Sequence, residues 1–128
     1  NTFAAGFPSN PAGGDNSRMN VTTFPAQGTN PKTAGVQFKV STAGFENIKL
    51  SMKVRHSNTS ANTVVLQYSA DSISYTDFQT FTVTAGDQWY NRDLDFSAIT
   101  ALKNNPKAAF RVITDFASGT TNYAAATT

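Results

Sequence analysis

The chain has 128 residues and no cysteine, so it is expected to form one domain, and disulfide frameworks, thiol nucleophiles and thiolate metal sites are excluded. Only 14% of the residues are charged and the formal net charge is +2, so charge alone predicts no polyanionic partner. Ser, Thr and Asn account for 41 residues and ten Phe stand beside four Leu, a composition that favours strands over helices and contains no apolar run long enough to span a membrane.

Residues 1–34 are predicted to form an extended arm packed on the body of the domain. This segment holds four of the five prolines and four of the eight glycines, and its only strand-like piece is 19–24. Phe3, Phe7 and Phe24 are expected to anchor the arm. The body then occupies residues 35–128.

The first strands of the body show the alternation of half-buried sheet. Residues 36–40 alternate between apolar and polar side chains, and residues 48–55 give the clearest pattern in the chain. One face of that strand carries Ile48, Leu50, Met52 and Val54. The other carries Lys49, Ser51, Lys53 and Arg55. The period of two excludes a helix here and sorts apolar and cationic side chains onto opposite sides of a sheet.

Four more strands follow at short intervals. They are predicted over 64–68, 81–83, 89–96 and 108–113, with Leu94 and Phe96 pointing inward. Gly86 and Asp87 are expected to turn the chain, and residues 97–105 are the one predicted helical turn, ended by Pro106. Short strands at such spacing, with no internal repeat, predict an all-β, antiparallel β-sandwich.

Linked sequence motifs carry a family resemblance. The segments GVQFKVSTAGFENIKLSMKVRHSNTS, LQYSADSISYTDFQTFTV, QWYNRDLDFSAI and NNPKAAFRV resemble the jelly-roll, galactose-binding-like modules of secreted bacterial enzymes and surface proteins. The resemblance implies a secreted module without catalytic activity, placed beside a parent enzyme's catalytic domain. Such modules continue past a small-residue loop into a final strand, so the sandwich is expected to lack or borrow its last strand. The arm, another chain or a longer form of this chain would supply it.

The sequence offers few catalytic groups. His56 is the only histidine, and no Ser-His-Asp arrangement can be assembled around it. Asp93 and Asp95 share one strand face, but a structural role is expected for both. One is predicted to pair with Arg92, and Asp95 to cap the helical turn. We therefore predict that the chain is not an enzyme.

Three aspartates are candidates for a metal site. Sandwiches of this kind often hold a structural Ca²⁺ in their loops, and Asp15, Asp71 or Asp77 could supply a carboxylate. The chain contains no Asp-x-Asp-x-Asp-Gly loop, and Asp71 followed by Ser72 is equally typical of an ordinary turn. No other cofactor is predicted.

The cationic strand face is the most informative candidate site. If Gln67 and Arg111 project into the same concavity as Lys53 and Arg55, the four side chains offer hydrogen-bond donors to sugar hydroxyls and to sulfate, carboxylate or phosphate groups. The alternative is that lysines on an exposed strand only maintain solubility and block edge pairing.

Aromatic side chains are the second requirement of a sugar site, because a pyranose ring packs its C–H face on Trp or Tyr. Trp89 and Tyr90 are adjacent, so one is expected to point inward and the other outward. Ten cations in 128 residues are too sparse for the basic, aromatic track of a nucleic-acid binder.

The predicted function is therefore a carbohydrate-binding or adhesion module that holds a secreted bacterial protein against a polysaccharide. Its predicted ligand-binding residues are Lys53, Arg55, Gln67, Trp89, Tyr90 and Arg111. The alternative is a structural subunit of an extracellular filament or surface layer, completed by strand donation between copies of the chain.

Overall fold

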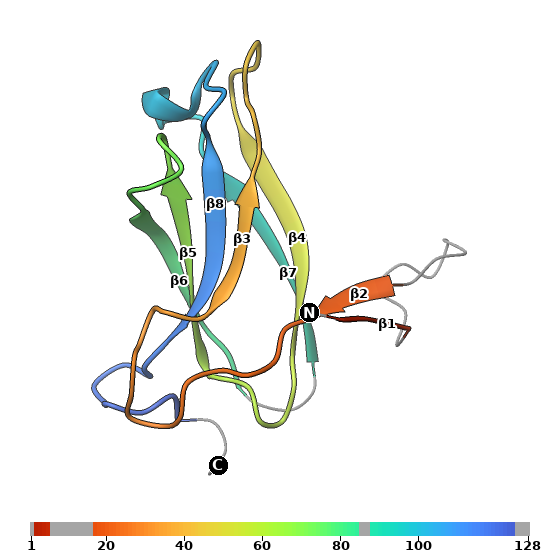
Figure 1. Cartoon of the computed structure of the whole chain (residues 1–128), viewed down its shortest axis with the longest axis vertical. Helices are drawn as coiled ribbons and strands as arrows, with labels where there is room; N and C mark the ends of the chain where they lie inside the picture. The colour runs from red at the N-terminus through yellow and green to blue at the C-terminus, as the bar shows by residue number, and fades with distance from the viewer. Residues whose placement is uncertain (1, 6–16, 85–87, 125–128) are drawn as a thin grey trace.

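The chain forms a single all-β domain of two antiparallel sheets packed against each other, seen in a computed structural model that describes residues 2–5, 17–84 and 88–124 (Figure 1). The large sheet has the strand order β3 (Gly35–Lys39), β8 (Ala109–Asp115), β5 (Thr63–Ser69) and β6 (Thr76–Thr82). The small sheet pairs β4 (Lys49–His56) with β7 (Gln88–Asp95). The predicted antiparallel β-sandwich is confirmed.

The N-terminal segment contributes two strands of its own. β1 (Thr2–Ala5) and β2 (Ser17–Asn20) pair with each other and belong to neither main sheet, and Figure 1 shows them projecting sideways from the sandwich near β4 and β7. β2 ends at Asn20, earlier than the predicted strand over 19–24, and Thr23 takes a positive φ of 66°, which is not extended backbone. Phe7 lies outside the described residues.

Residues 27–34 are tied to the base of the sandwich. The Lys32 amide donates to the Thr114 carbonyl at 3.0 Å, and the Tyr123 hydroxyl donates to the Thr29 carbonyl at 3.0 Å. The side chain of Lys32 reaches Asp77 on β6. Because β5 lies between β8 and β6, this side chain crosses β5 on the outer side of the large sheet.

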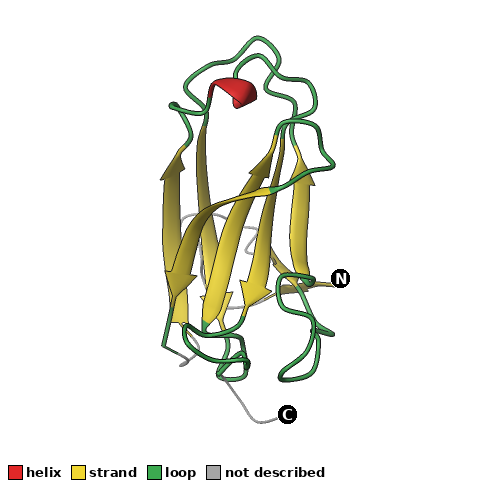
Figure 2. Ribbon diagram, turned by 90° about the vertical axis from the view of Figure 1, so that its left-hand side faces the viewer, coloured by secondary structure: helices red, strands yellow, loops and turns green. Residues whose placement is uncertain are grey.

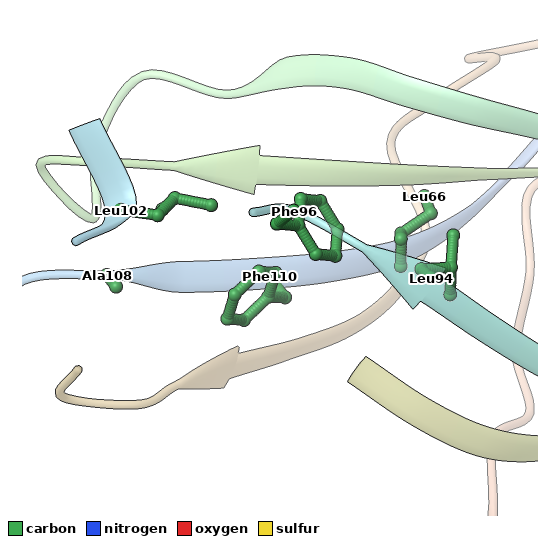
Figure 3. Packing of buried hydrophobic residues seen from close by; sticks show 6 residues of the cluster. All are labelled: Leu66, Leu94, Phe96, Leu102, Ala108 and Phe110. Carbon is green, nitrogen blue, oxygen red and sulfur yellow. The ribbon is translucent and has the colours of Figure 1, made fainter. Parts of the chain in front are cut away.

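The core lies between the sheets and is built around aromatic rings. Phe96 is 1% exposed and lies beside Phe110 (Figure 3), with the two ring centroids 5.1 Å apart. The ring centroid of Phe78 lies 4.1 Å from that of Phe96. Leu94 and Leu66 extend the same buried cluster along the sandwich. The predicted inward placement of Leu94 and Phe96 is confirmed.

β4 and β5 show how position in a sheet decides burial. In β4 the polar side chain of Lys53 is exposed and its neighbours Met52 and Val54 are partly buried, as the alternation predicts. In β5 both faces are buried, and Val65 is fully buried although it alternates with Leu66. β5 is a central strand, flanked by β8 and β6 and crossed by Lys32 on its outer side, so it has no solvent-facing side.

Two elements differ in length from their predictions. The helical turn predicted over 97–105 is a short 3-10 helix, Thr100–Leu102, at one end of the sandwich (Figure 2). β6 begins at Thr76 rather than at residue 81, and the prediction missed its first part because these residues are mostly polar. A bulge shifts its pairing with β5 between Leu66 and Gln67. The turn expected at Gly86 and Asp87 lies outside the described residues.

Candidate functional site

The two sheets are unequal, and the difference leaves part of the large sheet uncovered. The described hydrophobic residues that pack in or against the core come from β4 to β8, the 3-10 helix and the loops, and none comes from β3. Phe38 pairs in register with the buried Phe110 and so points to the same side of the sheet, yet Phe38 is 42% exposed. Val40, just after β3, is 49% exposed. The small sheet therefore does not extend over β3.

A cleft of about 770 Å³ occupies this uncovered region between β3 and β4. Its lining includes Val36 and Phe38 from β3, Lys53, Val54 and Arg55 from β4, and residues 21–25 and 27 of the N-terminal segment. We call it the β3–β4 cleft. Within the described ranges β4 pairs with β7 alone, so its second edge, which borders this cleft, has no strand neighbour.

The outer face of the small sheet gathers three of the predicted binding residues. The register places Arg55 opposite Trp89 and Lys53 opposite Asn91, and these four residues share the face that points away from the core. We call this group the Lys53 face. Lys53 and Asn91 are exposed, and Arg55 and Trp89 are partly buried. Two cations and an aromatic ring thus lie side by side on neighbouring strands.

Acidic side chains on the same sheet lie further along the strands. Asp95 contacts the Lys49 ammonium at 3.6 Å and accepts the Ser97 amide at 2.8 Å, and the Ser97 hydrogen bonds lower the pKa of this carboxyl. Ser51 donates its hydroxyl to Asp93. Asp93 and Asp95 are therefore held by Ser51, Lys49 and Ser97 toward the end of the strands that lies away from Arg55 and Trp89.

Arg92 does not form the ion pair with Asp93 or Asp95 that the sequence predicts. Its side chain lies on the inner face of β7, and its guanidinium carbon is 4.2 Å from the ring centroid of Phe81 and 5.0 Å from that of Tyr90. The predicted cap also differs, because Asp95 bonds to Ser97 while the residue that precedes the 3-10 helix, Ile99, makes no side-chain cap.

Tyr90 lies on the inner side of the small sheet, opposite to Trp89. Its ring meets that of His56 edge-on, with centroids 5.4 Å apart, and its hydroxyl donates to the Thr84 carbonyl at 3.3 Å. His56 is 3% exposed. Burial lowers the pKa of its imidazole, the positive charge of Arg92 lowers it further, and a hydrogen bond with the Ala61 backbone opposes both. The expected division of Trp89 and Tyr90 between the two faces is confirmed, and only Trp89 joins the Lys53 face.

Gln67 and Arg111 lie on the outer face of the large sheet, on the opposite side of the sandwich from the Lys53 face, so the structure does not bring the four predicted donors into one concavity. Gln67 donates to Asp77 at 2.7 Å. Arg111 donates through Nε to Gln37 at 2.9 Å, and its guanidinium carbon lies 3.4 Å from the ring centroid of Tyr75. Both side chains have partners within the fold.

The candidate calcium ligands are used in local hydrogen bonds. Asp71 accepts the amides of Ile73 and Ser74 at 2.8 and 2.7 Å, and these bonds lower the pKa of its carboxyl. Asp77 binds Gln67 and Lys32, and both contacts lower its pKa. Asp15 lies outside the described residues. In the part of the chain that the structure describes, no three His, Cys, Asp or Glu side chains are grouped as a metal site would require.

Two features of the site were not predicted from the sequence. Asn91 joins the Lys53 face only through the register of β4 with β7, and Phe38 was assigned to a half-buried strand although the cleft exposes it. The alternation at 36–40 identified the side to which Phe38 points, but nothing in the sequence shows that no strand covers that side.

The described residues include no helix with the length and apolar character of a membrane span. Searches of known protein families, curated proteins and solved structures give no match to this chain.

Proposed function

We propose that the chain is a non-catalytic carbohydrate-binding module of a secreted bacterial protein and that the Lys53 face binds an anionic polysaccharide. The observation that carries this proposal is the β4–β7 register, which sets Lys53 and Arg55 beside Trp89 and Asn91 on one outer face. The resemblance of the sequence to jelly-roll accessory modules supports the same function and an extracellular location.

Each member of the Lys53 face has a chemical role in this proposal. The Arg55 guanidinium offers paired donors to a sulfate or carboxylate group, and the Lys53 ammonium adds a point charge. The Trp89 ring supplies a surface for the C–H face of a sugar, and the Asn91 amide can both donate to and accept from hydroxyls. So few contacts on an open face predict a dissociation constant of roughly micromolar to millimolar.

Affinity electrophoresis over neutral and sulfated polysaccharides tests the proposal. Retention is expected on the sulfated polymer and is expected to weaken with added salt, because exposed charges are screened. Lys53→Ala and Arg55→Ala should each weaken binding by about fivefold, equivalent to about 1 kcal/mol.

Lys39→Ala is the matched control, since Lys39 is also an exposed strand lysine but lies on the outer face of the large sheet. It removes the same charge from the other side of the molecule and should leave retention unchanged. Equal effects of Lys39→Ala and Lys53→Ala would show that net charge, and not the Lys53 face, causes the retention. Unchanged retention of both Lys53→Ala and Arg55→Ala would also refute the proposal.

A further inference from the structure

The β3–β4 cleft combines two incomplete surfaces. The backbone edge of β4 that borders the cleft has no strand neighbour among residues 2–5, 17–84 and 88–124, and of the β3 side chains that face it Phe38 is exposed and Val36 is partly buried. A bare strand edge offers a row of N–H and C=O groups to an incoming strand, and an exposed apolar strip favours burial. The other open edge of the small sheet, on β7, lies toward β6, where Arg92 packs on Phe81.

The space beside β4 is suited to one extended segment. A strand paired to β4 would lie about 4.8 Å from it, and sheets pack about 10 Å apart, so this strand would sit over β3. Among the strands of the large sheet only β3 contributes no residue to the core packing, and residues 21–25 and 27 of the N-terminal segment also line the cleft.

The side chains of β4 define the chemistry of that segment. Positions facing inward would lie beside Met52 and Val54 and above Val36 and Phe38, which favours aliphatic side chains. Positions facing outward would lie beside Lys49, Lys53 and Arg55, and oppositely charged pairs across neighbouring strands are stabilising. The segment should therefore alternate aliphatic and acidic residues.

We propose that the β3–β4 cleft binds a β-strand of a partner polypeptide in which aliphatic and acidic residues alternate, and that this strand pairs with β4. The N-terminal hairpin of a second copy fits less well. Its strands, Thr2–Ala5 and Ser17–Asn20, contain no acidic residue and one arginine, Arg18, and they already pair with each other. Strand addition to a sheet edge uses main-chain hydrogen bonds for affinity and alternate side chains for specificity.

A fluorescent peptide of alternating valine and glutamate tests the proposal, with its length matched to the 8 residues of β4. Fluorescence anisotropy with the whole chain should give saturable binding. A peptide of alternating valine and lysine should bind at least about tenfold more weakly, because like charges face each other across the strands. A valine and glutamate peptide methylated at alternate backbone amides should lose binding, because it cannot donate to β4.

Phe38→Ser and Phe45→Ser form a matched pair of variants. Phe38 lines the cleft at 42% exposure, whereas Phe45 is a loop residue with 68% exposure outside it. Phe38→Ser should weaken peptide binding by about fivefold or more, and Phe45→Ser should leave it unchanged. Neither variant should alter retention on a sulfated polysaccharide, so failure of this proposal is separable from failure of the Lys53 face.

Three results would overturn the proposal. One is the absence of saturable peptide binding by a chain whose dispersed NMR spectrum shows that it is folded. Another is equal binding of the glutamate and lysine peptides, which would remove the role of the β4 cations. The third is concentration-dependent self-association that Phe38→Ser abolishes, together with no binding of the glutamate peptide, which would assign the cleft to a second copy of the chain.

Discussion

His56 is a buried imidazole held against Tyr90, with the positive charge of Arg92 on the same inner face. The pKa of His56 in the folded chain lies below the ordinary value of 6.5, so the unfolded chain binds the proton more readily. Stability from the neutral imidazole is complete above about pH 6.5 and decreases as the pH falls toward the folded-state pKa.

We therefore expect the free energy of unfolding to be lower at about pH 5.5 than at about pH 7.5. Urea denaturation at the two pH values measures it. His56→Gln should reduce the difference, because glutamine does not titrate in this range. An equal pH dependence in the variant would assign the effect to other groups.

Arg111 was predicted to bind ligand, but its contacts point to a role in stability. Its guanidinium stacks on the Tyr75 ring and bonds to Gln37, and it joins the loop before β6 to β3 and β8. Arg111→Ala should lower the free energy of unfolding by about 1 kcal/mol, the typical contribution of a cation–π contact. Lys39→Ala, on the same outer face, should change it by less than about 0.5 kcal/mol. Equal values from urea denaturation would contradict this role.

At the scale of the strand, the start of β3 depends on the absence of a side chain at Gly35. A Cβ atom at this position would lie 2.0 Å from the Val112 carbonyl oxygen and 2.7 Å from the Ile113 Cα. These are backbone atoms of the paired strand β8, so the strands must separate to admit a methyl group. Gly35→Ala is expected to destabilise the chain by about 2 kcal/mol or more, measured by thermal or urea denaturation. A change within about 0.5 kcal/mol would show that the β3–β8 pairing is looser than described.

β4 should show two classes of backbone amide. Alternate amides bond to β7, and those between them face the open edge of the cleft. Residue-resolved hydrogen exchange should alternate between slow and fast along Lys49–His56, by about tenfold or more. Adding the valine and glutamate peptide should slow the fast class. Uniform protection without peptide would show that a strand already covers this edge.

At the scale of the whole molecule, local alternation in the sequence predicted the strands and the sandwich well. Residues 48–55 sort into two faces without ambiguity, and Leu94 and Phe96 lie in the core as their pattern indicated. Alternation assigns a face to each side chain, and two packed sheets then follow from burying the apolar faces.

Alternation does not determine which outer face a strand shares with another. Lys53 and Arg111 both alternate away from apolar neighbours, yet they lie on opposite sides of the sandwich because β4 and β8 belong to different sheets. Asn91 lies opposite Lys53 only through pairing register, which a single strand does not encode. The sheet to which each strand belongs and its pairing register are therefore known only from the structure.

The most direct test of the proposed function is NMR chemical-shift mapping of the labelled chain during titration with a sulfated oligosaccharide. The register that joins Lys53 and Arg55 to Trp89 and Asn91 predicts a contiguous set of shifts at these four residues, including the Trp89 indole N–H. Shifts that gather instead at Gln67 and Arg111, or no shifts at millimolar sugar, would contradict it.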